Sequence, residues 1–377
     1  MEERKRGQEI VICFASGYLV SNICTSCIAG DLRQSQGYLA LANLVRSAGS
    51  SQARQGAPVM NLVKVQDLNE GTFGVVMLAH DSATNEQVAI KFLERGAGIS
   101  RGVLREVLNH RLCVAHPNIV QFREIFLTAK HLAIVMEYAS GGDMFDYVIK
   151  NKGAGPGEGL PEDVARSFFQ QLILAVDFCQ KLGIANRDIK LENTLLDGSL
   201  PQPRVKLCDF GYSKNEFVDS RPKSVSGTPD YIAPEILLND HYDGKSADIW
   251  SCGVMLYVML TAVLPFAKRG DDRANNLVRL QQLFPRIVAG QYQPPRRASD
   301  LCKDLLKRML TPDPNLRITT DGIMQHPWFM VDPATIDLNA QLLQRPVPSQ
   351  VQTPEQIETI VKQARAVQAT LVPNWAD

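Results

Sequence analysis

The pattern of apolar residues changes once along this 377-residue chain, and the change limits the folds that it can adopt. Between residues 61 and 138, short apolar runs separated by turn residues are typical of β-strands, with one helical period over 104–112. From Pro161 onward helical patterns dominate, and residues 247–260 are apolar all round, as in a helix at the centre of a domain. Strands first and helices later predict an α+β fold, in which a small β-rich N-lobe joins a larger α-helical C-lobe.

Residues 1–58 form a different kind of segment. A charged start is followed by an uncharged stretch, residues 10–30, which Ser, Gly, Asn and Thr interrupt. A spanning helix needs about 20 mostly apolar residues, so this stretch is marginal, and basic residues before an apolar run are also typical of a weak signal or anchor. The favoured interpretation is a disordered extension or a wrongly assigned start, followed by a linker over 47–57. Organelle targeting and membrane anchoring stay as alternatives.

The net charge and the cysteine content indicate which partners and which cellular compartment to expect. Lys plus Arg and Asp plus Glu both number 40, so the net charge is zero and general binding of nucleic acid is not expected. Eight cysteines lie mostly within apolar runs and lack the spacing of a disulfide framework, which indicates a reducing compartment. We therefore expect a cytoplasmic protein, a nuclear protein or one found in both, for which a membrane is not a partner.

Three features of the N-terminal half are weak signals when each is taken alone. Gly71 and Gly74 lie in a turn between two strand-like runs, and glycine lets backbone amides approach phosphate oxygens closely. Lys91 ends a strand-like run (VAIK), a position where a lysine is usually solvated. Glu106 lies on the predicted helix and suits an exposed helix face equally well.

Three motifs further along the chain change that interpretation. They are RDIKLEN at 187–193, DFG at 209–211 and APE ending at Glu235. With the glycine turn and the lysine they make up the signature set of protein kinases, in the order of that family. The chain thus resembles a protein kinase, which implies the bilobal kinase fold and transfer of the γ-phosphoryl group of ATP to a protein hydroxyl. The resemblance also implies two structural contacts, an ion pair of Glu235 with Arg317 and support of the catalytic loop by Asp248.

The resemblance assigns the binding of the nucleotide to particular residues of this sequence. Gly71 and Gly74 would form a flap over the phosphates, and Val76 would touch the adenine ring. Glu137 and Tyr138 would belong to a hinge that meets adenine through its backbone. ATP is the expected nucleotide.

The same resemblance assigns the residues of the transfer itself. Lys91 would hold the α- and β-phosphates and be oriented by Glu106. Asp188 would accept the proton of the substrate hydroxyl, and Lys190 would stabilise the γ-phosphate and indicates a serine/threonine rather than a tyrosine kinase. Mg²⁺ is the expected metal cofactor, and its oxygen ligands would come from Asn193 and Asp209.

Longer stretches narrow the resemblance to one group of kinases. They are distinctive at 88–96, 132–142, 190–199, 207–214 and 242–261. They are similar to the plant and algal sucrose-non-fermenting-related protein kinases of the second subfamily, which implies a role in osmotic-stress or nutrient signalling. The likeness covers roughly residues 60–330, so we predict a kinase domain over 59–330 and a C-terminal extension over 331–377.

One helix is predicted within that C-terminal extension, over residues 354–367. Thr353 to Gln356 read as a capping box with proline at the first helical position. An apolar stripe follows, made of Ile357, Ile360, Val361, Ala364 and Val367. In the family such a helix packs against the N-lobe helix that carries Glu106 and holds it in the active position. The alternative is a surface helix or a piece of a coiled coil.

Two acidic residues predict the choice of substrate. Asp143 and Glu192 match positions at which related kinases bind an arginine upstream of the phosphorylated residue. Because two carboxylates hold a guanidinium strongly and directionally, we expect protein substrates with basic residues near the Ser or Thr. The alternative is that both are simply exposed acids.

Control by phosphorylation is predicted from Arg187, which precedes the catalytic aspartate. A phosphate in the activation loop would give this arginine a partner and order the segment. Ser224 lies where the family carries its activating serine, and Ser226 is a second candidate. An upstream activating kinase and an opposing phosphatase are therefore expected partners.

Two residues depart from the kinase pattern. Asn69 replaces the first glycine of the flap, and Asn186 replaces the histidine that normally lies under the phenylalanine of DFG. Neither change removes a charge that the transfer requires. An active, loop-regulated kinase is the main hypothesis, and a pseudokinase scaffold with weak or no transfer is the alternative. A membrane-anchored receptor kinase is a third hypothesis that rests on residues 10–30 alone.

Overall fold

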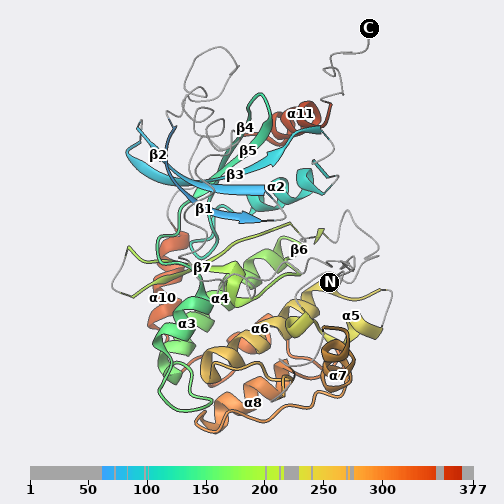
Figure 1. Cartoon of the computed structure of the whole chain (residues 1–377). Coiled ribbons are helices and arrows are strands. Elements are labelled where there is room, and N and C mark those ends of the chain that lie inside the picture. The colour runs from blue at the N-terminus through green and yellow to red at the C-terminus, as the bar shows by residue number, and fades with distance from the viewer. Residues whose placement is uncertain are drawn as a thin grey trace, which may run out of the picture.

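A five-stranded antiparallel sheet forms the smaller lobe of the molecule (Figure 1). Its strands follow the order β1-β2-β3-β5-β4, so β1 and β4 are its edges. The strands are β1 Leu62–Gly71, β2 Gly74–Asp81, β3 Glu86–Glu94, β4 Phe122–Leu127 and β5 His131–Glu137. Helix α2, Val103–Leu112, lies between β3 and β4 in the chain and packs on one face of the sheet.

The computed structural model describes residues 62–71, 74–82, 84–96, 99–100, 102–199, 202–211, 214–215, 229–238, 241–268, 271, 276–344 and 352–366. The predicted N-terminal extension, residues 1–58, lies outside the described residues. The two candidate phosphorylation sites, Ser224 and Ser226, also lie outside them.

Alternation of side chains along β5 explains why the sheet is buried on both faces. Leu132 and Ile134 belong to a cluster with residues of α2, whereas Ala133 and Val135 belong to a second cluster on the opposite face. Successive residues of a strand point to opposite faces, so a run of apolar residues is buried on both sides. The turn from β2 to β3 depends on Asn85, whose φ of 60° is one that asparagine tolerates.

Helices make up most of the larger lobe (Figure 1), which contains the largest cluster of buried apolar residues in the described part of the chain. The helices are α3 Met144–Asn151, α4 Glu162–Lys181, α5 Pro234–Leu238, α6 Gly244–Thr261, α7 Asn276–Val288, α8 Asp300–Met309, α9 Thr320–Met324 and α10 Ala334–Leu343. The larger lobe also contains short strands and 3₁₀ turns: β6 Ile184–Ala185, Leu191–Asn193, β7 Thr194–Asp197, β8 Arg204–Leu207, β9 Lys214–Asn215 and Pro229–Tyr231.

Helix α6 is the centre of the larger lobe, as its apolar sequence predicts. It is buried along almost its whole length, and its Trp250 stacks on Phe266 with ring centroids 5.3 Å apart. The helix begins where the Asp243 carboxylate accepts from the N–H groups of Lys245 and Ser246. It ends at Ala262, whose φ of 54° is left-handed and cannot continue the helix.

Helix α11, Pro354–Arg365, returns to the small lobe and packs against α2 and β4 (Figure 1). Its capping box is present in both directions, between Thr353 and Gln356. The helix ends two residues before the predicted limit, because Ala366 takes the C-cap position. Val367, the last residue of the predicted stripe, lies outside the described residues.

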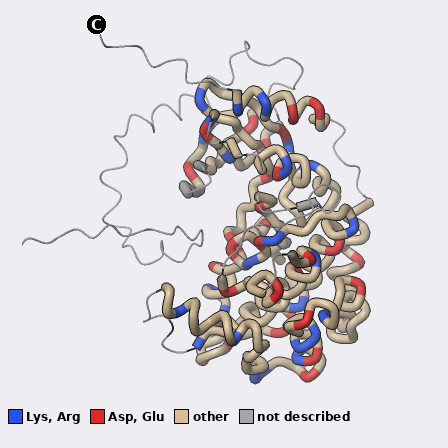
Figure 2. The backbone as a smooth tube through the Cα atoms, turned by 90° about the vertical axis from the view of Figure 1, so that its right-hand side faces the viewer, with Lys and Arg blue, Asp and Glu red and all other residues tan. Residues whose placement is uncertain are grey.

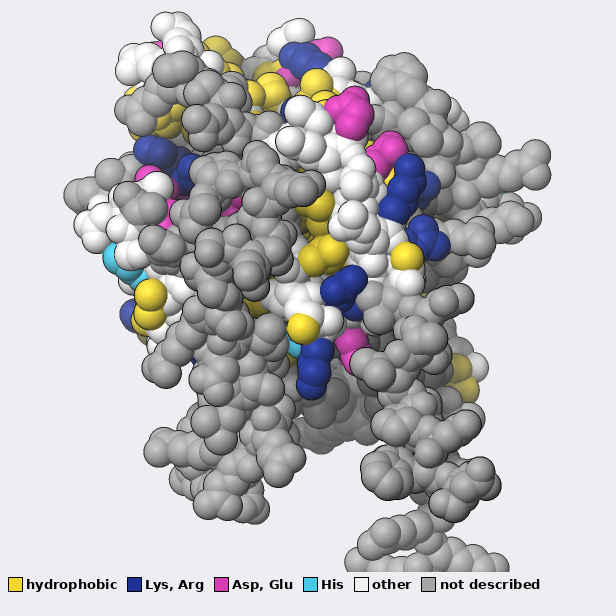
Figure 3. All heavy atoms as spheres, turned by 90° about the horizontal axis from the view of Figure 1, so that it is seen from above, with side chains coloured by type: hydrophobic (Ala, Val, Ile, Leu, Met, Phe, Trp, Pro, Cys, Tyr) yellow, Lys and Arg dark blue, Asp and Glu magenta, His cyan; other side chains and the backbone are white. Residues whose placement is uncertain are grey.

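Basic and acidic residues are interspersed along the backbone of both lobes (Figure 2). From above, basic, acidic and apolar side chains all show on the described part of this face (Figure 3). Among the helices that the structure describes, none combines the length and apolar character that crossing a membrane requires.

Candidate active site

An ion pair between β3 and α2 fixes the small-lobe side of the site. Nζ of Lys91 donates to Oε1 of Glu106 at 2.7 Å, and both side chains are about 15% exposed. Burial alone lowers the pKa of Lys91, but the Glu106 and Asp209 carboxylates outweigh it, so the pKa is raised. Lys91 is therefore a cation bound by Glu106, and the structure contains the ion pair that was predicted from the sequence.

Asp188 lies in the loop between β6 and β7, and two donors hold one of its oxygens. Nζ of Lys190 donates to Oδ2 at 3.0 Å, and Nδ2 of Asn193 donates to the same oxygen at 2.7 Å. Because both donors use Oδ2, Oδ1 is the oxygen left to face a substrate. Burial raises the pKa of Asp188 in spite of the neighbouring lysine, which makes it a better proton acceptor than an exposed aspartate.

Asp209 follows β8 with a backbone that few residues adopt. Its φ is 61°, and its Oδ1 accepts from the N–H of Gly211 at 2.8 Å. A side chain at Gly211 would lie 3.0 Å from that oxygen and 3.5 Å from Oε2 of Glu106. The glycine therefore lets the Asp209 segment lie close to the ion pair of the small lobe.

Asn186 and Phe210 depart from the arrangement that the kinase resemblance implies. Nδ2 of Asn186 donates to the backbone oxygen of Asp209 at 3.0 Å, where a ring would otherwise lie under Phe210. Phe210 instead stacks on His110 of α2, with ring centroids 5.1 Å apart and planes 16° apart. Phe210 thus contacts α2, and Asn186 contacts the backbone of Asp209.

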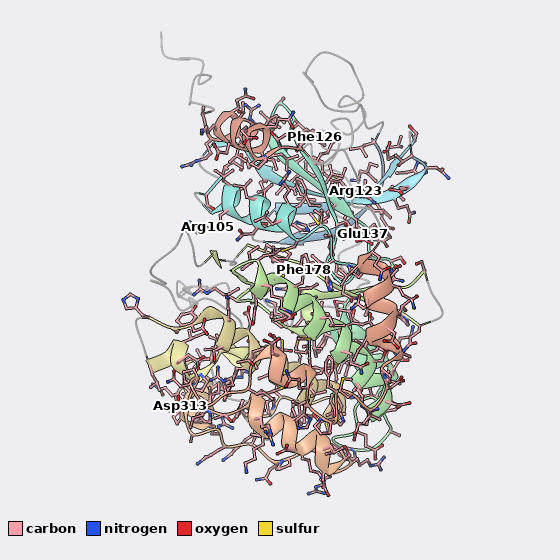
Figure 4. All side chains as sticks on the ribbon, turned by 180° about the vertical axis from the view of Figure 1, so that it is seen from behind. Arg105, Arg123, Phe126, Glu137, Phe178 and Asp313 are labelled. Carbon is pink, nitrogen blue, oxygen red and sulfur yellow. The ribbon has the colours of Figure 1, made fainter. Side chains whose placement is uncertain are left out.

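The hinge residues lie where β5 leads into the larger lobe. Glu137 occupies the lower edge of the small lobe (Figure 4). Its carboxylate pairs with Lys206 of β8 at 2.6 Å and accepts from the N–H of Gln121 at 3.0 Å. The side chain is thus engaged with the protein, so adenine would meet Glu137 and Tyr138 through the backbone.

The flap residues close the β1–β2 hairpin. Gly71 pairs with Gly74, and Asn69 lies opposite Val76 in the same pair of strands. Val76 also lies opposite Lys91 on β3, so the residue predicted to touch adenine and the lysine predicted to bind phosphates are neighbours.

Two acids lie on the large-lobe side of the site. Asp143 caps α3 by accepting from the N–H of Asp146 at 2.8 Å. Burial raises the pKa of both Asp143 and Glu192, and the charge of Asp143 raises that of Glu192 further. Oε2 of Glu192 is buried without a hydrogen-bond partner. The structure therefore brings the two predicted substrate acids together, and a cation would satisfy both.

The two predicted structural contacts are confirmed. Both oxygens of Glu235 accept from the guanidinium of Arg317, at 2.6 and 2.8 Å, in a fully buried pair. The carboxylate of Asp248 accepts from the backbone N–H groups of Asn186 and Arg187, at 2.7 and 2.8 Å. The contacts of Asp248 fix the loop that carries Asp188 onto the core helix α6.

Arg187 already has an aromatic partner. Its guanidinium lies 4.8 Å from the centroid of the Tyr242 ring. The predicted phosphorylation sites that would engage this arginine lie in the segment that the structure does not describe.

His110 and Lys206 contribute to the site but were missed in the sequence. His110 lies four residues after Glu106 on the same helix, so helical spacing puts both on one face and provides a usable signal. Lys206 follows a buried valine in the run RVKL, and nothing local indicates that this lysine is buried against the hinge.

Comparisons with known proteins agree with this geometry. A family model described as "Protein kinase domain" matches residues 62–329. Serine/threonine-protein kinase SAPK3 of Oryza sativa subsp. indica is 50% identical over 268 residues, which cover 71% of this chain and 76% of the rice protein. Serine/threonine-protein kinase SRK2C of Arabidopsis thaliana is 47% identical over 303 residues, covering 80% and 84% of the two chains. SAPK2 of Oryza sativa subsp. japonica is 46% identical over 307 residues, covering 80% and 86%. The chain therefore belongs to the protein kinase family, and the three relatives described here are plant serine/threonine-protein kinases.

Proposed function

We propose that this kinase transfers the γ-phosphoryl group of ATP to Ser or Thr residues that lie near basic residues in proteins. The observation that carries the proposal is the arrangement at Asp188. One of its oxygens is held by two donors, its pKa is raised, and Lys190 lies 3.0 Å away. Few other functions need a buried carboxylate presented in this way beside a lysine.

ATP would bind between the flap and the hinge. Gly71 and Gly74 would cover the phosphates, Val76 would touch adenine, and the backbone at Glu137 and Tyr138 would hydrogen-bond to its edge. The raised pKa of Lys91 keeps its charge available for the α- and β-phosphates.

The donor set at the site fits Mg²⁺. The amide nitrogen of Asn193 faces Asp188, so its oxygen faces the other way, and Asp209 offers a carboxylate. Mg²⁺ commonly takes one or two such protein oxygens together with phosphates and water. When bound, it would neutralise the charge of the β- and γ-phosphate oxygens.

The transfer needs positioning more than covalent help from the protein. The substrate hydroxyl would give its proton to Oδ1 of Asp188 while its oxygen forms a bond to the γ-phosphorus. The bond from that phosphorus to the β,γ-bridging oxygen breaks, and ADP leaves. Lys190 would neutralise charge on the phosphoryl group as it moves between the two oxygens.

Preference for basic substrates is supported by Asp143 and Glu192. Two neighbouring carboxylates with raised pKa values, one of them with an unpartnered buried oxygen, are stabilised by a cation. A substrate arginine provides that cation and can bind in a bidentate manner.

Regulation would act through Arg187. Phosphorylation of Ser224 or Ser226 by an upstream kinase would offer this arginine a charged partner in place of the Tyr242 ring, and a phosphatase would reverse the effect. A role in stress or nutrient signalling, in the cytoplasm or nucleus, is the setting that we propose for this control.

A set of four peptides tests the proposed function. We would compare ³²P transfer from Mg-ATP to peptides R-x-x-S, R-x-x-T, R-x-x-Y and A-x-x-S. We expect transfer to the first two, about tenfold lower kcat/KM for the alanine peptide, and none to tyrosine. Glu192→Gln should bring the arginine and alanine peptides to within about twofold of each other, because it removes the charge that recognises arginine. Equal use of arginine and alanine peptides by the unaltered protein would contradict the proposed substrate class.

A further inference from the structure

Asn186 makes three hydrogen bonds that connect separate parts of the site. The residue is 1% exposed, and its backbone N–H donates to Oδ2 of Asp248 at 2.7 Å. Its Oδ1 accepts from the backbone N–H of Asp188 at 3.1 Å. Its Nδ2 donates to the backbone oxygen of Asp209 at 3.0 Å. The carboxamide therefore lies between the residue that would accept the proton and the residue that would bind Mg²⁺.

Both segments that the carboxamide contacts have left-handed backbones. The bond to the Asp188 N–H spans Arg187, whose φ is 70°, and the other bond ends on Asp209, whose φ is 61°. Only four non-glycine residues of the described part of the chain have positive φ, and these are two of them. Such conformations persist where surrounding contacts hold them in place, and Asn186 supplies contacts to both.

Residues 186–193 of the catalytic loop include no aromatic side chain that could stack on Phe210. The ring stacks on His110 of α2, which leaves the loop side of the Asp209 segment to the Asn186 carboxamide. A stack is tolerant of small displacements, whereas a hydrogen bond is directional. The two arms of Asn186 therefore restrict the direction in which the Asp188 and Asp209 segments can approach each other.

We propose that Asn186 is a positioning residue, which holds Asp188 and Asp209 in register through the two arms of its carboxamide. The inference rests on the proposed phosphoryl transfer, in which these two aspartates act together. Asn186, although it departs from the kinase pattern, would thus have a role in this site. The amide donor is the arm that acts on the metal side, and the amide acceptor is the arm that acts on the proton-accepting side.

Three variants of the full chain test this role. Asn186→Asp keeps the shape and the acceptor but loses the donor, Asn186→Ala loses both arms, and Asn186→His restores an N–H donor. Asn151→Asp is the matched control, because Nδ2 of Asn151 also donates to a backbone oxygen, that of Tyr147, at an exposed position. Thermal unfolding of each variant shows whether it is folded before its function is measured.

The expected result is a lower rate of transfer together with weaker metal-dependent binding of nucleotide. Asn186→Asp and Asn186→Ala should lower kcat about 10- to 100-fold, the usual effect of removing a group that orients a metal ligand. The KM for the peptide should stay within about twofold, because Asp143 and Glu192 are untouched. The Kd for Mg-ADP should rise about tenfold, while the Kd for ADP in excess EDTA should not change. Asn186→His should stay within about threefold of the unaltered protein in both measurements.

The binding measurements separate this inference from the proposed function. If the unaltered chain transfers no phosphate, the proposed function fails, and the Mg-ADP titrations still decide the role of Asn186. Folded Asn186→Asp or Asn186→Ala protein with unchanged kcat and unchanged Mg-ADP affinity would overturn the inference. If neither of these variants folds, Asn186→His decides the question. The inference requires that this variant bind Mg-ADP as tightly as the unaltered chain does. A folded Asn186→His protein that binds Mg-ADP more weakly would overturn the inference.

Discussion

Burial sets the protonation state of the individual residues around the site. It raises the pKa of Asp188 and lowers the pKa of His110 and His116 to about 4. His116 packs on Phe178 of α4, which lies at the top of the larger lobe (Figure 4), and its Nδ1 accepts from the N–H of Asn118. Nearby Lys206 disfavours a second positive charge at this position.

The lowered pKa of His116 predicts that the protein loses stability in mild acid. An unfolded histidine binds a proton near pH 6.5, whereas folded His116 binds one only near pH 4. The unfolded state thus binds more protons between these values, so stability is fully present above pH 6.5 and falls as the pH drops toward 4. The share of His116 is about 2 kcal/mol at pH 5.

Urea unfolding at pH 7 and pH 5 checks this prediction. His116→Asn keeps an acceptor for the Asn118 N–H but cannot be protonated, so its loss between the two pH values should be smaller by about 2 kcal/mol. The same substitution at exposed His241 should leave the loss as it is in the unaltered chain. Equal losses in His116→Asn and the unaltered chain would contradict the prediction.

Residues with a local or motif signal could be predicted, and those that depend on distant packing could not. The pairs of Lys91 with Glu106 and of Glu235 with Arg317 follow from the resemblance to protein kinases. The hydrogen bonds of Asn186 could not be predicted, because they depend on where the Asp209 backbone lies after the chain has turned. From the sequence, Asn186 could be recognised only as a replacement for the usual histidine, and the two segments that its side chain joins could not be foreseen.

At the scale of elements, the residue that leads into α11 hydrogen-bonds to the edge strand of the small-lobe sheet. Strand β4 is an edge, and Gln352, just before α11, bonds to both backbone groups of Ile125 in that strand. Its Oε1 accepts from the Ile125 N–H at 2.8 Å, and its Nε2 donates to the Ile125 oxygen at 2.9 Å. The apolar stripe of α11 then packs into the cluster that contains α2.

Substitution of Gln352 tests whether this contact with the edge strand contributes to stability. Gln352→Leu leaves the N–H and C=O of buried Ile125 unpaired, so we expect a loss of about 1–3 kcal/mol in the free energy of unfolding. Denaturant unfolding measures the loss, and Gln325→Leu at an exposed position serves as control. If α11 also holds α2 in place, the variant should lose transfer activity as well. Unchanged stability would show that the contact with Ile125 contributes nothing.

The two C-terminal helices differ in how far the sequence predicts them. The capping box and the apolar stripe predict α11 to within two residues of its end, because both signals are local. Helix α10 was not predicted, since its sequence ATIDLNAQLL has no clear apolar stripe. It is held instead by buried Asn339, which donates to Oδ1 of Asn118 at 2.6 Å. That contact spans 221 positions of the chain and has no local signal.

At the scale of the whole molecule, a buried ion pair joins the two lobes beside the hinge. Lys206 of β8 and Glu137 of β5 are 2.6 Å apart, with side chains 5% and 20% exposed. Two lobes and their order follow from the change of apolar pattern, but this contact between them does not. Breaking one side of a buried pair is costly, because the remaining charge then has no opposite charge beside it.

Lys206→Met predicts a loss of stability that a second change repairs. We expect the single variant to lose about 1–3 kcal/mol, and Lys206→Met with Glu137→Gln to recover most of it, because no unpaired charge then remains. Lys303→Met, which breaks an exposed pair with Asp300, should cost less than about 0.5 kcal/mol. A double variant no more stable than Lys206→Met would contradict the account of the pair.

Phosphoryl transfer through Asp188 is the central claim for the molecule, and one comparison tests it most directly. We would measure ³²P transfer from Mg-ATP to an R-x-x-S peptide by the full chain, by Asp188→Asn and by the surface control Asp300→Asn. Transfer should fall about 10²- to 10⁴-fold in Asp188→Asn, the usual contribution of a general base, and stay unchanged in the control. Equal transfer by Asp188→Asn, or none by any protein even after phosphorylation by an upstream kinase, would contradict the account and favour a scaffold.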